Sequence, residues 1–250
     1  ENGGGGEVMV KEGILDTFDI KEVYALHNAP GVEVGNFYTT PGPIMAAADS
    51  FDIHIVGNGG HGAMPHATAD PIMAAVGIAN AIQTIVSRNN YSQDNLVVSI
   101  TQIHTGSADN VVPEKAYMNG TVRTFDPAVR TMVMARLEAI VAGQAAAYGV
   151  EARMDYLVGY PATINEPERT EFAAEVAREI AGDAGVDGNA PPEMGAEDFA
   201  YLLEKRPGSY LFVGNGDTAG LHHPEYDFDD EAAAAGASFF AKLIERALPL

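Results

Sequence analysis

A change of hydrophobic pattern between residues 48 and 160 limits how this chain can fold more than any other feature of the sequence. Alternating strand patterns and one-sided helix patterns follow one another there in the order strand, helix, strand, strand, helix, strand. The predicted elements are residues 50–56, 70–88, 96–103, 116–123, 126–148 and 152–160. This order is that of the ferredoxin-like split unit. We therefore predict a ferredoxin-like βαββαβ domain at residues 48–160, inserted into an α/β chain.

The two flanks, residues 1–47 and 161–250, share a different pattern of short apolar strands that end at glycine and proline turns. The elements predicted in them are strands at residues 22–26, 34–39 and 209–213 and helices at residues 7–15, 167–181, 196–203 and 229–247. Together they favour one domain in two parts, a mixed sheet with helices, which the inserted domain interrupts.

The composition excludes several classes of function. The net charge of −21, from 35 acidic and 14 basic residues, repels nucleic acid and anionic membranes. No apolar run is long enough to span a bilayer. With no cysteine, disulfides and thiolate metal sites are excluded. We expect a cytoplasmic protein whose acidic surface is either ordinary or an adaptation to high salt, and the composition leaves both open.

The first residues are acidic and glycine-rich, which does not resemble a signal peptide, and the chain does not open on a methionine. We expect the sequence to be a piece of a longer protein, a processed product or a trimmed form of it.

Two histidines and one carboxylate stand at positions where ligands gather. His27 ends an apolar strand, His222 follows a strand and a glycine-rich loop, and Glu1 borders a glycine loop that opens a helix. The carboxyl ends of strands in an α/β sheet are common ligand sites, and two histidines with a carboxylate are a common set for catalytic zinc. Taken singly, each histidine is equally explained as a structural hydrogen-bonding group.

Polar residues in the inserted segment and after it allow both functional and structural interpretations. His61 lies in a glycine-rich loop where an imidazole can stabilise an oxyanion, or it faces solvent in a plain turn. Arg123 suits bidentate binding of a carboxylate, or it pairs with the nearby Asp126. Glu197 lines a pocket or favours a helix dipole. His54 is expected to be structural, and the role of His104 stays open.

Seven motifs occur in the order found in a known enzyme family. They are Glu1-Asn2 with four glycines, Leu26-His27-Asn28, Gly60-His61-Gly62 through His66, Asn110-Val111-Val112-Pro113, Gly120 through Asp126, Gly195-Ala196-Glu197-Asp198-Phe199 and Leu221-His222-His223-Pro224. The chain resembles the aminoacylase and hippurate hydrolase branch of the dinuclear metallopeptidases, and the resemblance covers nearly its whole length. Each motif is weakly specific, whereas seven in order are strongly so.

The resemblance implies a metallopeptidase catalytic domain interrupted by a lid that forms a homodimer. It implies divalent metal, two ions of zinc or of manganese, cobalt or nickel. The residues it marks are Glu1, His27 and His222 as metal ligands, His61 as the lid histidine that reaches a partner's active site, Asn110 and Arg123 at the substrate's carboxylate end, and Gly195 and Glu197 along the pocket.

The resemblance also implies what lies outside this sequence. The family's general base would immediately precede Glu1, and further metal ligands would lie upstream, so these residues alone are expected to be inactive. The expected reaction is hydrolysis of the amide bond of an N-acyl amino acid or a similar carboxylate-bearing amide. Two alternatives remain: a non-catalytic dimerisation module and a small-molecule sensor of the ferredoxin-like type.

Overall fold

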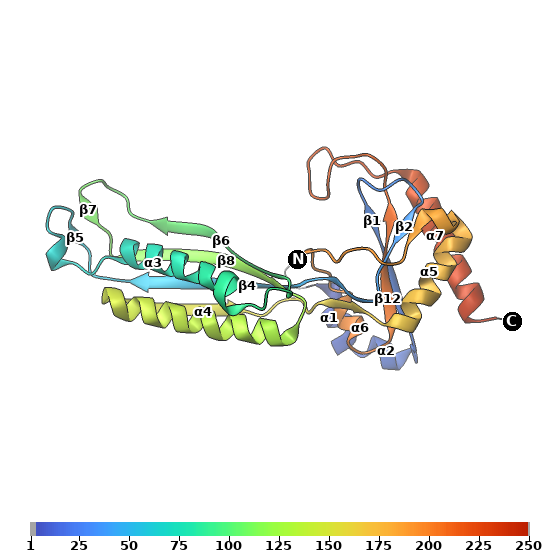
Figure 1. The fold of residues 1–250 in the computed structure, drawn as a ribbon, viewed down its shortest axis with the longest axis horizontal. Helices are drawn as coiled ribbons and strands as arrows, with labels where there is room; N and C mark the ends of the chain where they lie inside the picture. Colours follow the sequence, from blue (N-terminus) through green and yellow to red (C-terminus); the bar gives the residue numbers. More distant parts are fainter. Residues whose placement is uncertain (1–3, 250) are drawn as a thin grey trace. The chain divides into compact units, whose positions relative to one another are not determined.

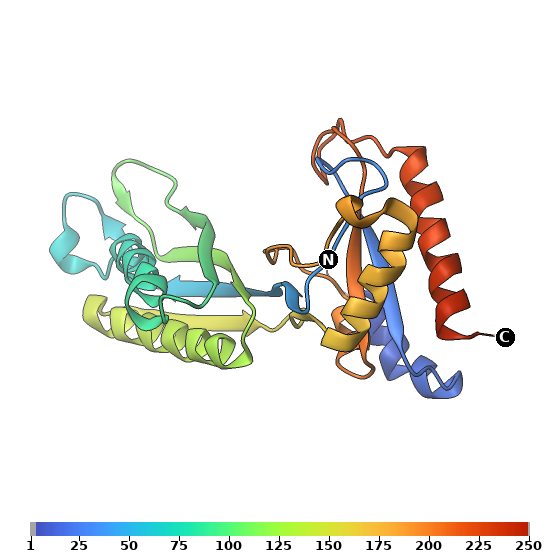
Figure 2. The same ribbon diagram turned by 45° about the vertical axis from the view of Figure 1, so that its right-hand side comes forward.

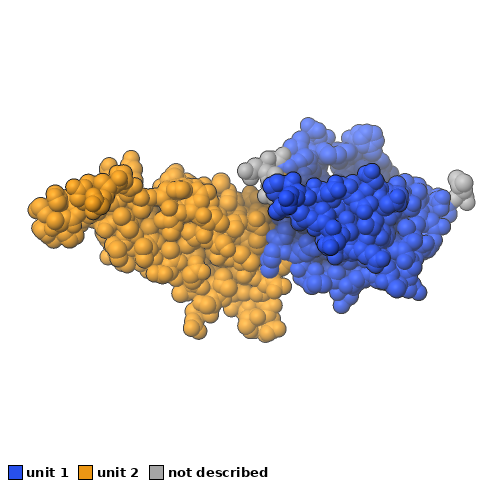
Figure 3. Space-filling view, turned by 90° about the horizontal axis from the view of Figure 1, so that it is seen from above, with its two compact units in different colours: residues 1–46, 161–250 blue, residues 47–160 orange. Residues whose placement is uncertain are grey.

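The computed structural model describes residues 4–249 of the chain. It consists of two compact units (Figure 3). Unit 1 comprises Glu1–Ala46 and Pro161–Leu250, and unit 2 comprises Ala47–Tyr160. The chain therefore enters and leaves unit 2 once each. Glu1, one of the predicted metal ligands, lies outside the described residues.

The main sheet of unit 1 has the strand order β1-β12-β2-β11. These strands are β1 (Val23–Ala29), β12 (Gly208–Gly214), β2 (Phe37–Tyr38) and β11 (Val186–Asp187). β1 runs parallel to β12, β12 antiparallel to β2, and β2 parallel to β11. The sheet is therefore mixed, and β1 and β12 end at the same edge.

Helices α5 (Pro167–Ala181) and α7 (Asp230–Ala247) cover one face of this sheet (Figure 1). Both begin where the sequence predicts, because Glu166 and Asp229 accept hydrogen bonds from backbone N–H groups of the first turn. Their apolar sides bury Phe37, Leu211 and Phe239. The opposite face of the sheet carries the candidate site.

The opposite face of the sheet is partly covered by an antiparallel pair of strands, β3 (Gly42–Met45) and β10 (Thr163–Asn165), and by the turn before α6 (Ala200–Leu203). Buried Asn165 ties this layer to the sheet: its Nδ2 donates to the carbonyls of Thr40 and Tyr210, and its Oδ1 accepts from the N–H of Tyr210. All these partners are neutral, so the tie does not depend on charge.

Two helices of unit 1 differ from the sequence prediction. The single helix predicted at residues 7–15 is split into α1 (Gly5–Lys11) and α2 (Ile14–Thr17), since Gly13 between them has a left-handed φ of +83°. The helix predicted from residue 196 begins only at Ala200. Glu197 and Asp198 therefore lie in a turn ahead of the helix. A short 3₁₀ turn, η3 (Asp183–Gly185), precedes β11.

Unit 2 is an antiparallel four-stranded sheet in the order β6-β8-β4-β9. The strands are β4 (Ala47–Val56), β6 (Leu96–Thr105), β8 (Lys115–Thr124) and β9 (Glu151–Leu157). His104, expected to follow a strand, lies inside β6. Gly120 of β8 has to be glycine, because a Cβ there would lie 2.2 Å from the ring of Phe51.

Helices α3 (Pro71–Thr84) and α4 (Pro127–Tyr148) lie side by side on one face of this sheet (Figures 1 and 2). Asp70 and Asp126 cap them, each followed by proline at the first helical position, as the sequence predicts. A π-helical turn, η2 (Ile85–Asn89), extends α3. The side chains fully buried between helices and sheet include Phe51, Ile53, Ile78, Ile82, Met118 and Leu137.

The far end of unit 2 carries the two-residue strands β5 (Gly60–His61) and β7 (Val111–Val112) and a 3₁₀ turn, η1 (Pro65–Ala67). At the other end, Asp49 is a buried carboxylate that accepts hydrogen bonds from Arg130, from the Tyr156 hydroxyl and from the N–H of Gly159. Burial alone would raise its pKa, but these hydrogen bonds together hold the pKa of Asp49 below its ordinary value. Among residues 4–249, no helix is long and apolar enough to cross a membrane.

Candidate active site

His27 lies on the face of the unit 1 sheet that α5 and α7 leave uncovered. In the parallel register it stands opposite Phe212, with the ring centroids 6.0 Å apart. Its Nδ1 is 2.8 Å from the carbonyl oxygen of Asn28. A carbonyl can only accept, so the proton of the neutral ring sits on Nδ1 and the lone pair is left on Nε2. A backbone carbonyl fixes metal-binding imidazoles in this way.

The loop that carries His222 is fastened beside His27. The side-chain amide of Asn28 donates to the hydroxyl oxygen of Tyr226, four residues after His222. Asn215, directly after β12, holds the base of the loop: its side chain donates to the carbonyl of Asp227 at 2.8 Å and accepts from the N–H of Asp229. The C-terminal ends of β1 and β12 and this loop therefore form one structure.

His222 has a left-handed backbone with a φ of +64°, which is unfavourable for a residue with a Cβ. Such strain persists where the surroundings enforce it, and it is concentrated at functional sites. The next residue, His223, is engaged differently: its Nδ1 accepts from the N–H of Glu225 at 3.1 Å. The backbone conformation singles out the first histidine of the pair.

Two tyrosines surround Phe212, the neighbour of His27, and each donates a hydrogen bond to a glutamate. Tyr38 stacks on Phe212 with the ring centroids 4.6 Å apart and donates to Glu193 at 2.6 Å. The Tyr210 hydroxyl donates to Glu197 at 2.7 Å. Burial, reinforced by Glu197, raises the pKa of Tyr210 far above its ordinary value, so the hydroxyl stays protonated.

Both carboxylate oxygens of Glu197 accept hydrogen bonds inside unit 1, one from Tyr210 and one from the N–H of Phe199 at 3.2 Å. The other predicted pocket residue, Gly195, accepts from the N–H of Ala46 at 2.8 Å. A Cβ at Gly195 would lie 2.8 Å from the terminal carbon of Met45. In the structure both residues hold the loop at residues 193–199 in place.

The glycine loop near the N-terminus contacts the same turn. The N–H of Gly6 donates to the Asp198 carboxylate at 2.8 Å, and a Cβ at Gly6 would lie 2.6 Å from the Asp198 carbonyl oxygen. Only glycine allows this approach. Asp198 thus anchors the start of α1.

Unit 2 brings together two predicted site residues, His61 and Asn110. β5 and β7 pair so that His61 stands opposite Val111, and the N–H of Gly62 donates to the Asn110 carbonyl at 2.7 Å. The Nδ1 of His61 accepts from the N–H of Ala63 at 3.1 Å. The proton of the neutral His61 ring therefore sits on Nε2, which is the proton arrangement of a hydrogen-bond donor.

Arg123 lies on the face of the unit 2 sheet that carries no helix. It donates to the Thr121 hydroxyl and to the Val122 carbonyl at 3.1 Å. The alternative partner, Asp126, instead caps α4 by accepting from the N–H of Ala128 at 2.6 Å. Within residues 4–249, Arg123 forms no ion pair, so the charge of its half-buried guanidinium is not neutralised by an adjacent carboxylate.

The candidate residues thus fall into three groups. Unit 1 holds His27, His222, Gly195 and Glu197. One end of unit 2 holds His61 and Asn110, and Arg123 lies at the opposite end of β8. Within the described part of the chain, no three histidine, aspartate or glutamate side chains are grouped closely enough to hold a metal ion. Sequence reasoning missed Tyr226 and Asn215, whose roles depend on partners that the local pattern does not reveal.

A family profile described as "Peptidase family M20/M25/M40" matches residues 1–246. The chain belongs to this family. It is 37% identical over 240 residues to a hippurate hydrolase of Campylobacter jejuni, covering 96% of this chain and 63% of that protein. It is 36% identical to an N-acetylcysteine deacetylase of Bacillus subtilis, covering 96% of this chain and 62% of that protein. The chain therefore spans a little over three fifths of these relatives.

Solved structures of family members have the same fold. An aminohydrolase from Staphylococcus aureus matches with a TM-score of 0.86 and 29% identity, covering 98% of this chain and 63% of that one. A dinuclear metal-binding peptidase of the M20 family from Bacillus subtilis matches with a TM-score of 0.78 and 30% identity, covering 97% of this chain and 61% of that one. Relatives named as hydrolases do not favour the two non-catalytic alternatives that the sequence left open.

Proposed function

We propose that the full-length protein is a metal-dependent amidohydrolase that cleaves the amide bond of N-acyl amino acids or related carboxylate-bearing amides. The observation that carries this proposal is the imidazole of His27. Its Nε2 lone pair is presented at the end of β1, where the loop of His222 is fastened. Membership in the family and relatives such as the hippurate hydrolase support the same reaction class.

The residues of unit 1 fit a divalent metal site. His27 has the tautomer that an Nε2 ligand requires. The left-handed backbone of His222 is a strained conformation of the kind found at ligand-binding and catalytic sites. Glu1, outside the described residues, is the third proposed ligand. When bound, one or two ions of zinc, manganese, cobalt or nickel would polarise the scissile carbonyl and acidify a water molecule.

The residues of unit 2 bind and orient the substrate in this proposal. His61 donates its Nε2–H to the oxygen that becomes negative in the transition state. Arg123 binds the free carboxylate of the substrate through a guanidinium that no carboxylate of the described chain neutralises. Arg123 lies at the opposite end of β8 from the loop of Asn110 and His61, so Asn110 is proposed to reach the same carboxylate end of the substrate from the partner subunit. Gly195 and Glu197 shape the pocket wall.

Unit 2 is proposed to be a ferredoxin-like lid that forms a homodimer. β6 is an edge strand, and α3 packs against it. Large apolar side chains on this side are nearly half exposed: Met73 at 48%, Val76 at 45% and Ile103 at 48%. A second copy pairing along β6 would bury them, since unpaired edges favour strand addition. Ile103→Glu should give a monomer in sedimentation, whereas Leu157→Glu, on the opposite edge strand β9, should remain dimeric.

The activity test uses the full-length protein after chelation and dialysis. We expect no hydrolysis of hippurate or N-acetyl amino acids without metal, and recovery when zinc, manganese, cobalt or nickel is restored. Metal bound per chain, measured by atomic emission, gives a readout that does not depend on finding the right substrate. Retained activity in the metal-free protein would overturn the proposal, and so would a full-length protein that binds no divalent metal.

A further inference from the structure

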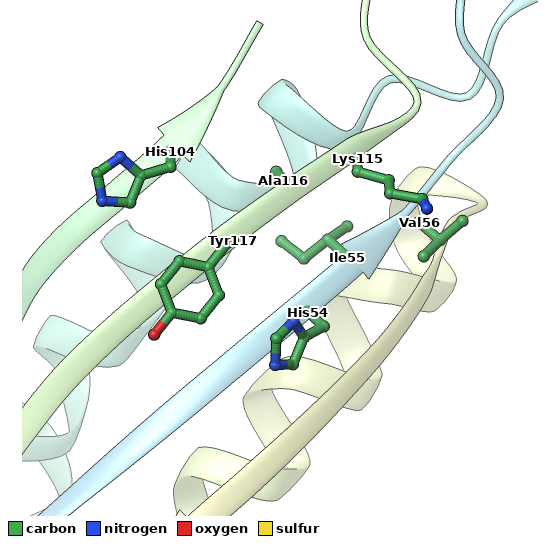
Figure 4. Close-up of a pocket in the computed structure, with 7 residues that line it drawn as sticks. All are labelled: His54, Ile55, Val56, His104, Lys115, Ala116 and Tyr117. Carbon is green, nitrogen blue, oxygen red and sulfur yellow. The ribbon is translucent and has the colours of Figure 1, made fainter.

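The face of the unit 2 sheet opposite α3 and α4 carries an ordered row of rings. His54 on β4, Tyr117 on β8 and His104 on β6 are direct neighbours in the strand register. The ring centroids are 5.2 Å apart for His54 and Tyr117 and 6.1 Å for His104 and Tyr117. These separations are in the range at which rings attract one another. Figure 4 shows the three side chains on adjacent strands, with the helices behind the sheet.

Hydrogen bonds hold two of the three rings, Tyr117 and His104, in place. The Tyr117 hydroxyl donates to Asp52, which also accepts from the side chain of Asn119 at 2.9 Å. These bonds lower the pKa of Asp52, and the bond to Asp52 raises the pKa of Tyr117, so the carboxylate stays charged and the phenol neutral. His104 Nε2 is 3.1 Å from the side-chain oxygen of Gln102. The row is therefore organised before any ligand arrives.

A positive charge lies at the other end of the Tyr117 ring. Lys115 precedes Tyr117 by two residues on the same face and stands opposite Val56. The Tyr117 hydroxyl points toward Asp52, away from Lys115 (Figure 4). Lys115 forms no ion pair within residues 4–249, although the chain has 35 acidic residues and only 14 basic ones.

The aspartates on this face interact with groups other than Lys115. Asp52 is engaged by Tyr117 and Asn119, and Asp155 pairs with Arg153 at 2.8 Å. Glu114 and Glu151 are exposed near the edge of the face. Within residues 4–249 none of these carboxylates forms an ion pair with Lys115, so its ammonium group is available to a ligand anion.

These groups line a shallow cavity of about 350 Å³. Its residues are His54, Ile55, Val56, His104, Lys115, Ala116 and Tyr117 (Figure 4). The volume lies within the range of small-ligand sites. It combines flat ring surfaces and an apolar Val56 with one cationic group, and this combination matches a ring that carries a single negative charge.

We propose that this face binds a small aromatic carboxylate, whose ring packs against Tyr117 and His54 and whose carboxylate binds Lys115. The site lies within unit 2 and shares none of the residues assigned to amide hydrolysis. It binds the ligand without chemical change. His54 and His104, for which the sequence indicated no function, are side walls of this site.

The first test is calorimetric titration of the full-length protein with benzoate. All variants carry Arg123→Ala, which removes the carboxylate site assigned to the substrate. We expect saturable binding that weakens about tenfold or more in Lys115→Gln, the loss of one charge-assisted hydrogen bond. Benzamide, which lacks the charge, should bind at least about tenfold more weakly than benzoate. Lys205→Gln, an exposed lysine in unit 1, should leave the affinity unchanged.

The second test separates the ring contact from folding. Tyr117→Leu should lose most of the affinity, whereas Tyr117→Phe, which keeps the ring and gives up the bond to Asp52, should retain most of it. Tyr91→Leu, an exposed tyrosine elsewhere in unit 2, is the matched control. Unchanged benzoate affinity in Lys115→Gln, or no saturable binding up to about 10 mM, overturns the proposal. Either result leaves the hydrolase proposal untouched, because that activity is measured separately.

Discussion

His27 in unit 1 and His61 in unit 2 are the same kind of side chain prepared for opposite tasks. At His27 a backbone carbonyl accepts a hydrogen bond from Nδ1–H, and Nε2 keeps a lone pair suited to a metal ion. At His61 a backbone N–H occupies Nδ1, and Nε2 carries a proton suited to a developing negative charge. One neighbouring backbone group decides whether the imidazole is an acceptor or a donor.

The comparison shows why one residue type serves both units. Each imidazole is oriented by a group one or two residues away in its own strand or turn, so each unit prepares its histidine without help from the other. A variant that removes one histidine should therefore leave the preparation of the other intact. The following predictions break or sharpen this contrast, from the largest expected effect to the smallest.

His27→Ala should have the largest effect. If the Nε2 lone pair holds metal, the variant of the full-length protein should lose both bound metal and amide hydrolysis. Atomic emission and a hippurate assay measure the two losses. His66→Ala, an exposed histidine of η1, is the control and should keep both. A His27→Ala protein with its full metal content would show that the acceptor assignment is wrong.

The units also differ in the buried polar group that ties their segments together. In unit 2 this group is the charged carboxylate of Asp49, and in unit 1 it is the neutral amide of Asn165. Asp49→Asn removes the charge of a buried carboxylate that accepts hydrogen bonds from Arg130 and Tyr156, and it should lower the free energy of unfolding of unit 2 by about 3 kcal/mol. Asp155→Asn, at an exposed pair, should cost less than about 1 kcal/mol. Chemical denaturation followed by circular dichroism measures both. Equal costs for the two variants would contradict the contrast.

The same pair of residues predicts a difference in pH dependence. The pKa of Asp49 is lower in the folded state, so its contribution is complete above the ordinary value of 3.8 and is lost as pH falls through the lower folded value. Unit 2 should weaken in acid through this group, and Asp49→Asn should flatten that dependence. The amide of Asn165 does not titrate, so its hydrogen bonds add no pH dependence to the stability of unit 1. An unchanged acid profile in Asp49→Asn would show that Asp49 does not titrate in this way.

His61→Ala removes a donor that acts only on the transition state. We expect kcat to fall about a hundredfold or more with little change in KM, and metal content to stay normal. His66→Ala, in the same segment, is again the control. If His61 serves the partner subunit, mixing the inactive His27→Ala and His61→Ala proteins should restore part of the activity. A near-normal kcat in His61→Ala would show that His61 does not donate to the transition state.

Arg123→Ala should have the smallest and most selective effect. A guanidinium that binds the substrate carboxylate acts on ground and transition states alike, so KM should rise about tenfold while kcat changes little. For an analogue with that carboxylate converted to an amide, KM should be the same with Arg123→Ala as with the unaltered protein. Arg123→Lys should recover part of the affinity for the carboxylate substrate. Equal loss on both substrates would instead assign Arg123 to the structure of the sheet.

Local sequence signals determined much of the fold. Asp70-Pro71, Asp126-Pro127 and Asp229 predict where α3, α4 and α7 begin, because capping involves only the first turn of a helix. Because these signals are local, two of the predicted helices, at residues 7–15 and 196–203, differ from the structure. Gly13 breaks the first helix through a left-handed backbone, and residues 196–199 stay outside α6 because Glu197 and Asp198 are held by Tyr210 and Gly6.

The residue types of the candidate site, and their order along the chain, were determined by the sequence alone. Only the tertiary structure decided which nitrogen of His27 or His61 carries the proton. It also decided that Asp126 caps α4 instead of forming an ion pair with Arg123, and that His54, Tyr117 and His104 form one row. The physical reason is that periodicity and capping report neighbours within a few residues of one another. Tyr210 meets Glu197 and Asn28 meets Tyr226 only after strands and loops distant in sequence have packed together.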